Sequence, residues 1–205
     1  MTRTKTQRKE GIGEGRCEGM LISSFGGEGT AARVAALEAR YEVRLPPEYR
    51  AFLCRYNGGF TPKTRFKIGA AASDLRGFFG GGTAKLNFES VNLNGWVARG
   101  LFPIACDSFG NYVAVSLREE SYGMIWFYDH ETESKLSPIC DSFCDFIRCC
   151  RSDRISDASR RSVEEREAVL TAAGKGDWIT DALRRMWQVE IERYAHLNQE
   201  RVVLE

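Results

Sequence analysis

The chain has 205 residues, of which 43% are hydrophobic and 28% charged, a composition typical of a folded globular protein. Its 29 Lys and Arg residues nearly balance 28 Asp and Glu residues, so the net charge of +1 gives no sign of direct binding to nucleic acid or to an anionic membrane. No apolar run reaches the roughly 18 residues of a membrane span, and the run at 20–22 is too short for the core of a signal peptide. We therefore expect a cytoplasmic protein.

The first 29 residues are rich in Gly, Thr and basic residues and show little apolar periodicity. A segment without a regular apolar face cannot bury enough surface to offset the entropy lost on folding. We therefore predict that 1–29 is a disordered leader. A start of the native chain at Met20 is an alternative that the sequence leaves open.

Two amphipathic helices are predicted next. From Thr30, the residues Val34, Leu37 and Tyr41 recur at spacings of three and four, which places them on one helix face. In the following stretch, LPPEYRAFLCRYNGG (45–59), two prolines suit a first helical turn, and Asn-Gly-Gly supplies the left-handed conformations that end a helix. The predicted buried face of this second helix consists of Tyr49, Phe52, Leu53 and Tyr56.

The middle of the chain changes to short runs rich in aromatic and β-branched residues, separated by Gly, Asn and Asp, which is typical of strands joined by turns. The runs predicted as strands are FKIG (66–69), KLNFESVNL (85–93), LFPIAC (101–106), NYVAVSL (111–117) and GMIWFYDHE (123–131). Residues 107–111 are a predicted hairpin loop. Because proline cannot donate a backbone hydrogen bond, Pro103 is expected at a strand start or at a sheet edge.

A further helix is predicted after the strands. Either Asp141 or Ser142 can cap it, and its buried face would consist of Phe143, Phe146, Ile147 and Cys150. Residues 151–161 are charged and contain few apolar residues, so we predict a linker there. The domain expected before this linker spans 30–150.

Residues 162–205 are predicted as a C-terminal helical extension. Ser162 and Glu165 have the spacing of a capping box, and Gly174 could close the helix that they begin. Asp177 could cap a longer helix after it. Two helices of this size cannot form a core alone, so we expect the extension to dock on the main domain or on a partner.

The sequence gives no sign of a metal or cofactor site. Seven cysteines are an odd number for a disulfide framework, and most lie in apolar segments, which favours buried or half-exposed thiols. Cys140, Cys144, Cys149 and Cys150 are clustered but lack the CxxC pairs typical of zinc sites. The glycine-rich run at 77–82 lacks the Lys and Ser/Thr of a phosphate-binding loop.

Catalysis has one candidate group, the turn Asp129-His130-Glu131. The other histidine, His196, lies far away in the C-terminal extension. A triad or a histidine-rich site needs a positioned nucleophile or a second imidazole, and neither is evident. A solvated turn is therefore the favoured interpretation, an enzyme using this turn stays an alternative, and we predict a protein without enzymatic activity.

Four segments, taken together, resemble the SUKH superfamily of bacterial immunity proteins and the yeast Smi/Knr cell-wall regulators. LPPEYRAFLCRYNGG is similar to the family's opening LP-x-x-Y-x-x-F-L-x-x-x-NGG, and GLFPIACDSFGNYVAVSL (100–117) to its Ile-Pro-Ile-Ala strand, polar turn and next strand. GMIWFYDHE is similar to the family's strand ending in Trp-Asp-His-Glu, although the tryptophan is displaced to Trp126. ICDSFCDFI (139–147) is similar to its helix opening, and the resemblance covers about 30–150.

The resemblance implies an α+β fold, with a largely antiparallel sheet flanked by helices and the additional C-terminal helices lying outside the match. It implies an immunity protein that neutralises a cognate toxin of a polymorphic or contact-dependent system by direct protein contact. Such toxins are nucleases, deaminases or other enzymes that act inside cells. The alternative is a non-enzymatic regulatory scaffold similar to the yeast branch, with the leader and the C-terminal helices as docking segments.

Partner-binding residues are expected among exposed polar and aromatic groups at the loops of the sheet. Carboxylates suit a toxin with a basic nucleic-acid cleft, because opposite charge accelerates association. A tryptophan there would be either a core residue or an aromatic anchor at the interface. The candidate set is Trp96, Asp107, Asn111, Asp129 and Glu131.

Overall fold

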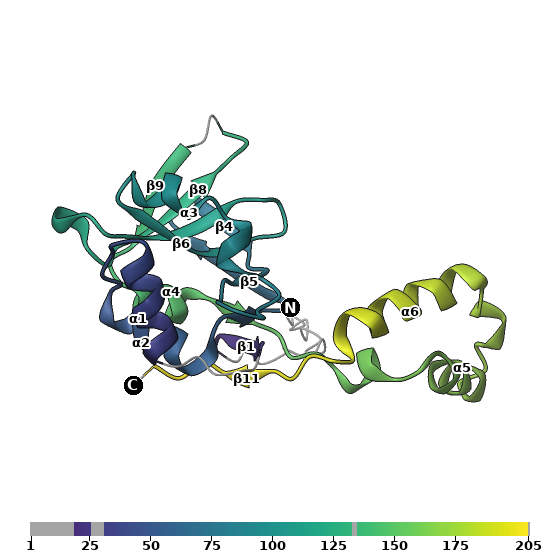
Figure 1. Cartoon of the computed structure of the whole chain (residues 1–205). Coiled ribbons are helices and arrows are strands. Elements are labelled where there is room, and N and C mark those ends of the chain that lie inside the picture. Colours follow the sequence, from purple (N-terminus) through teal and green to yellow (C-terminus); the bar gives the residue numbers. More distant parts are fainter. Residues whose placement is uncertain (1–18, 26–30, 133–134, 205) are drawn as a thin grey trace, which may run out of the picture.

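The computed structural model describes residues 19–25, 31–132 and 135–204, which form a main body built on β-sheet and a projecting helical segment (Figure 1). The strands are β1 (Leu21–Ser24), β2 (Gly59–Phe60), β3 (Thr64–Ile68), β4 (Ala71–Asp74), β5 (Gly77–Phe78), β6 (Leu101–Cys106), β7 (Tyr112–Ser116), β8 (Ile125–Asp129), β9 (Lys135–Cys140), β10 (Arg151–Ser152) and β11 (Glu200–Arg201). The α-helices are α1 (Ala31–Arg40), α2 (Pro47–Tyr56), α3 (Leu93–Val97), α4 (Phe143–Cys149), α5 (Val163–Ala172) and α6 (Asp181–Tyr194). The 3₁₀ turns are η1 (Phe88–Ser90), η2 (Glu119–Ser121), η3 (Asp157–Arg160) and η4 (Gly176–Trp178).

The strands form two antiparallel sheets. An 8-stranded sheet has the order β11-β1-β2-β5-β6-β7-β8-β9, and a 3-stranded sheet has the order β10-β3-β4. Helices from both ends of the chain accompany these sheets, α1 and α2 before most strands and α4 after them. The predicted α+β fold, with a largely antiparallel sheet, flanking helices and further C-terminal helices, is confirmed.

The helix α2 has the ends that the sequence predicts. Asn57 follows it with a left-handed backbone (φ 48°), and Gly58 continues the turn at φ 78°. A Cβ atom at Gly58 would lie 2.7 Å from the carbonyl oxygen of Phe78, so only glycine fits this close approach. The predicted face is buried, and the Phe52 ring lies 4.8 Å from that of Phe78 and 5.2 Å from that of Phe143.

The helix α4 completes this aromatic core. Of the two possible caps, Ser142 is the one used, because its hydroxyl accepts the N–H of Asp145 at 3.1 Å. The predicted face of Phe143, Phe146, Ile147 and Cys150 is buried. The Phe146 ring packs edge-on against Phe66 of β3, so α4 joins the large sheet to the small one.

The predicted strand KLNFESVNL (85–93) is wrong. This segment forms η1 and leads into α3, and its one sheet-like contact is an isolated bridge from Asn87 to Gly80. Two asparagines account for the difference: the side-chain oxygen of Asn87 accepts the N–H of Glu89, and that of Asn92 accepts the N–H of Gly95. Such local bonds compete with a strand ladder for the backbone.

Two further expectations are corrected. Pro103 lies inside β6, between β5 and β7, where the register with β7 shifts between Pro103 and Ala105. A bulge is the one interior position in a sheet that tolerates a residue without an N–H. The cap of α6 is Thr180, whose hydroxyl accepts the N–H of Leu183, whereas Asp177 lies in the 3₁₀ turn η4.

The predicted disordered leader, 1–29, falls mostly outside the described residues. Its described part contains β1, in which Leu21 and Ile22 are fully buried, so this portion of the prediction is wrong. The strand pairs with β2 on one side and with β11 on the other. Its two apolar residues, preceded by Met20, are too short a run to show periodicity, and the partner strands lie far along the chain.

The C-terminal segment leaves the main body and returns to it. The first residues of the expected linker 151–161 form β10, which pairs with β3, and the chain comes back as β11 beside β1. Between them, residues 156–196, here called the arm, project away from the sheets and contain α5 and α6 (Figure 1). The capping box of Ser162 and Glu165 is present at the start of α5, and Gly174 (φ 71°) follows its end.

The arm has a small core of its own. Trp187 of α6 is buried, and the Arg166 guanidinium of α5 lies 5.8 Å from its ring centroid. Arg166 also pairs with Glu190 at 2.8 Å. This contact of a buried cation with a packed indole and a carboxylate holds α5 against α6.

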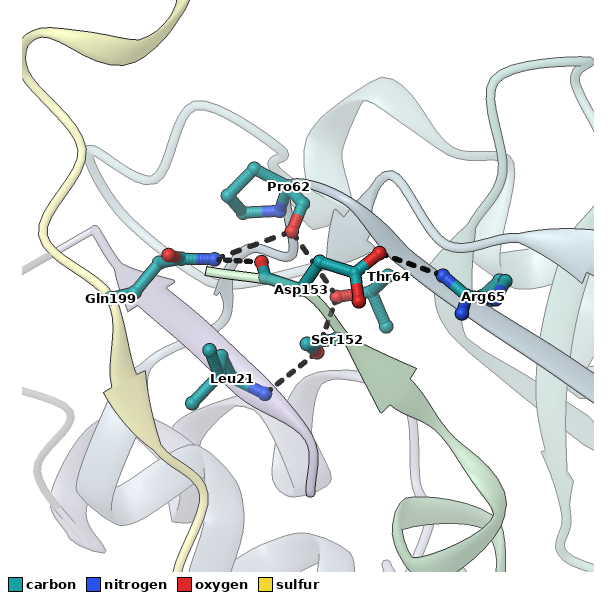
Figure 2. Close-up of polar contacts among 7 residues, drawn as sticks. All are labelled: Leu21, Pro62, Thr64, Arg65, Ser152, Asp153 and Gln199. Atoms are coloured by element: carbon teal, nitrogen blue, oxygen red, sulfur yellow. Dashed lines mark hydrogen bonds and ion pairs between the residues drawn. The ribbon is translucent and has the colours of Figure 1, made fainter. Parts of the chain in front are cut away.

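A buried polar network joins the base of the arm to both sheets (Figure 2). Ser152 Oγ accepts the N–H of Leu21 at 2.8 Å and lies 2.7 Å from the hydroxyl of Thr64. The Gln199 side chain accepts the N–H of Ile155 at 2.7 Å and donates to the carbonyls of Pro62 and Asp153 at 3.4 and 3.2 Å. The two ends of the arm are therefore fixed to each other and to the β2–β3 loop.

This network gives a stability prediction. Replacing Ser152 by Ala should lower the free energy of unfolding by about 1–3 kcal/mol, because the N–H of Leu21 would be left buried without an acceptor. Chemical denaturation monitored by circular dichroism measures the change. Ser137→Ala is the matched control: Ser137 is half-buried in β9, its hydroxyl bonds to none of the described residues, and a change within about 0.5 kcal/mol is expected. Equal losses in the two variants would contradict the role of Ser152.

Candidate functional site

The loop between β6 and β7 is organised around one buried carboxylate. Asp107 Oδ1 accepts the N–H groups of Phe109 at 2.9 Å and of Asn111 at 2.8 Å. Its Oδ2 accepts the hydroxyl of Ser73 and the side-chain amide of Asn111, both at 2.7 Å. A carboxylate with its lone pairs used in this way holds the loop in one conformation.

Asn111 links this loop to the next turn of the sheet. Its Oδ1 accepts the N–H of His130 at 3.1 Å and lies 2.8 Å from Nδ1 of the same residue. Residues 107–111 and 129–132 therefore form one connected surface at the end of the sheet, here called the sheet-end face. The chain segments that build it are brought together by the pairing of β7 with β6 and β8.

Two of the predicted binding residues do not have the exposure that the sequence led us to expect. Asp107 is 3% exposed and Asn111 is 9% exposed, so neither presents its polar atoms to a partner. The reason is that both side chains satisfy backbone N–H groups, Asp107 those of its own loop and Asn111 that of His130. They position the face rather than form its outer surface.

Asp129 and Glu131 lie at the rim of the same face. The Asp129 carboxylate accepts the hydroxyl of Thr132 at 2.8 Å and the N–H groups of Glu131 and Thr132 at 3.0 and 3.2 Å. The hydrogen bond from the Thr132 side chain, together with these backbone N–H groups, lowers the pKa of Asp129. Glu131 is exposed, so the rim presents negative charge near neutral pH.

Trp96 belongs to an aromatic cluster next to this face. Its ring lies 5.3 Å from that of Tyr128 and 5.5 Å from that of Tyr112, and the two tyrosines pair across β7 and β8. All three rings are half-buried. Trp96 is thus an intermediate case between the core residue and the exposed anchor that the sequence left open.

The most exposed aromatic residue of the face is Phe109, which sequence reasoning passed over. It is 67% exposed at the tip of the β6–β7 loop, although its own N–H is bonded to Asp107. The sequence contains a sign of this exposure, because a phenylalanine at the centre of the polar hairpin loop Asp-Ser-Phe-Gly-Asn is flanked by residues that favour solvent. The face therefore combines one exposed apolar ring with carboxylates at its rim.

The contacts of the candidate catalytic turn, Asp129-His130-Glu131, are with neighbouring turn residues. His130 is exposed, and one face of its ring lies near Gly110, where a Cβ atom would be 3.4 Å from its Cε1. Its Nδ1 is next to the Asn111 side chain, and among the described residues no hydroxyl or thiol bonds to the imidazole. The contacts orient the ring without activating a nucleophile.

The clustered cysteines do not form a metal site within the described part of the chain, which has no group of three or more His, Cys, Asp or Glu placed to hold a metal ion. Cys17 lies outside it. Burial raises the pKa of Cys106 to about 11 and that of Cys140 to about 12, and it also raises the pKa of Cys150. These thiols therefore stay protonated near neutral pH.

The carboxylate at the rim gives a second prediction. Asp129 should titrate below the ordinary value of about 3.9 for aspartate, and its contribution to stability should be present above that value and lost as the pH falls through the lower folded-state pKa. Thr132→Val removes the hydroxyl donor and should move the midpoint back upward. Carboxyl ¹³C chemical shifts followed against pH measure both midpoints. A midpoint that does not move in the variant would refute the hydrogen bond as the cause.

None of the helices in the described ranges is long and apolar enough to cross a membrane. A model of the SMI1/KNR4 family (SUKH-1) matches residues 28–149, which is more than half of the chain. Searches of curated proteins and of solved structures found no match. The matched range includes every residue of the sheet-end face and ends before the arm.

Proposed function

The chain belongs to the SMI1/KNR4 family (SUKH-1), and we propose that it is an immunity protein that binds and neutralises a cognate bacterial toxin by direct protein contact. The family includes toxin immunity proteins as well as the yeast Knr4 branch. The toxin would be a nuclease, a deaminase or another enzyme that acts inside the cell, and the protein would meet it in the cytoplasm. Neutralisation would require occlusion of the toxin and no chemistry by this chain.

The observation that supports this proposal most directly is the sheet-end face, with Phe109 exposed on a loop that Asp107 holds in place. Aromatic residues are prominent among the positions that dominate binding energy at protein interfaces. A ring on a fixed loop loses little entropy on binding, which favours affinity. The face thus has the properties of a preorganised protein-binding surface.

The rim of the face supports the choice of partner. Asp129 and Glu131 place carboxylates at the rim of the face that bears the exposed ring. A toxin that acts on nucleic acid would present a basic cleft to them. Opposite charges increase the association rate of two proteins and favour the correct partner over others. Trp96 and its two tyrosine neighbours would extend the contact as a half-buried apolar border.

A matched pair of variants tests this proposal. Phe109 and Trp178 are both aromatic and are 67% and 62% exposed, but Phe109 lies on the sheet-end face and Trp178 on the arm. Phe109→Ser should weaken binding to the toxin domain encoded beside the gene by about 30-fold or more, and should abolish protection of cells that express this toxin. Trp178→Ser should leave both unchanged. Binding is measured by calorimetry and protection by growth.

The pair also separates the alternatives. Loss of protection in Trp178→Ser with full protection in Phe109→Ser would place the toxin contact on the arm and overturn the assignment to the sheet-end face. The immunity function itself would be overturned if the adjacent toxin domain did not bind the unmodified chain and if cells that express both proteins were not protected from the toxin.

The arm gives a specific reason to keep the regulatory scaffold as a second candidate function. It projects from the main body (Figure 1). The apolar side chains of Trp178, Met186 and Val189 are exposed on it. Exposed apolar side chains on a projecting segment favour a docking role for this segment. Under this alternative, affinity capture would recover the same cellular protein with Phe109→Ser as with the unmodified chain, and would lose it with Trp178→Ser.

A further inference from the structure

A cavity of about 740 Å³ lies between the main body and the end of α6. Its wall contains Lys63, Arg76 and Lys85 from the main body and Arg193 and His196 from the arm, and its one acidic residue is Asp74. The cavity is thus strongly basic on a chain whose charges otherwise nearly balance, with 29 basic and 28 acidic residues.

The positive charges of this basic pocket are only partly offset by nearby carboxylates. Asp74 directs its carboxylate to Ser108, with one oxygen accepting the N–H at 3.0 Å and the other the hydroxyl at 2.5 Å. Over the described residues, none of the four Lys and Arg side chains of the pocket has a carboxylate within 4.0 Å. An excess of cations gathered in a hollow raises the local concentration of anions.

Two of the cations are held in place by aromatic rings. The Lys63 ammonium lies 5.4 Å from the ring centroid of Tyr194, and the Lys85 ammonium lies 6.0 Å from that of Phe60, and both rings also line the pocket. Cation–π contacts of this kind keep the ammonium groups over the pocket wall. Each ammonium lies over one face of its ring, where it competes with the stacking of a nucleic-acid base.

The backbone at Lys63 is an independent sign. Its φ of 55° is a left-handed conformation that costs a lysine more free energy than a glycine. Strained positions persist where the surrounding structure enforces them, and they cluster at binding sites. At this position, the lysine side chain reaches the ring of Tyr194 and so connects the main body to the arm.

We propose that this basic pocket is a second binding site, which takes the acidic side chains of a protein partner. Carboxylates of a short acidic segment match four cations, two of them in contact with aromatic rings, around a cavity of this size. A polynucleotide is less suited, because a lysine lies over one face of each of the two rings and the chain as a whole has a net charge of only +1. The site is separate from the sheet-end face, and its existence does not depend on the toxin assignment.

The proposal is tested with the full chain and three variants. The probe is a capped oligoglutamate peptide of about six residues, titrated by calorimetry at low salt, where exposed charges are least screened. Lys85→Glu with Arg193→Glu should weaken its binding by at least about tenfold. Lys63→Gly should also weaken binding, while the melting temperature stays the same or rises, because glycine relieves the left-handed backbone. The matched control, Arg99→Glu with Arg185→Glu, makes the same charge change at two exposed arginines outside the pocket.

The outcomes are distinct. Weaker binding in both pocket variants and unchanged binding in the control would support the pocket as an acidic-segment site. No measurable binding of the peptide to the unmodified chain, or an equal loss in the control, would overturn the proposal. Tighter binding of a single-stranded oligonucleotide or of inorganic phosphate than of the peptide, lost in the same variants, would assign the pocket to that ligand and overturn the choice of a protein partner.

Discussion

The hydroxyl of Ser152 is the contact on which the architecture depends most. It lies between the backbone of Leu21 and the side chain of Thr64, so it joins the large sheet, the small sheet and the strand that leads into the arm. A consistent assignment of hydrogens has Leu21 donating to Ser152, Ser152 to Thr64, and Thr64 to the carbonyl of Pro62. Without its acceptor, each of these three donors would be left unpaired in a buried position. The need to keep all three hydrogen bonds favours one relative position of the two sheets.

The same physical requirement governs the sheet-end face. The N–H groups of these turns need acceptors: Asp107 accepts those of Phe109 and Asn111 in its own loop, and Asn111 accepts that of His130 in the neighbouring turn. The polar residues therefore turn inward, and the apolar Phe109 is left outside. This inversion of the usual arrangement produces an exposed ring on a rigid support, with the solvent-exposed charges of Glu131 and its neighbours confined to the rim.

The elements that the sequence predicts correctly are those whose causes are local. The prolines, the apolar face and the Asn-Gly end of α2 are adjacent in the chain, and the same holds for the capping box of α5. The strands β1, β10 and β11 are short, with two residue pairs in each of their ladders, and their partners lie far away in sequence. No periodicity exists in so few residues, so only the tertiary structure defines them.

The candidate site likewise has features with local causes, which the sequence predicts, and features that depend on distant residues, which it does not. The type of residue at 107–111 and 129–131 indicates a turn with polar side chains, and that much is visible from sequence. Whether Asp107 faces a partner or the N–H of its own loop depends on Ser73, which lies on a different strand. The basic pocket is further from prediction still, because Lys63, Lys85 and Arg193 are neighbours only after the arm has returned to the body.

That return has a consequence for how such a chain can change. The outgoing residue Asp153 and the returning residue Gln199 are joined by a hydrogen bond, so residues 156–196 behave topologically as an insertion between two strands of the body. An insertion whose two ends already meet adds little strain when its length or sequence varies. The body can therefore keep its hydrogen bonds while the arm is lengthened, shortened or exchanged as one module, which allows one scaffold to acquire different partners.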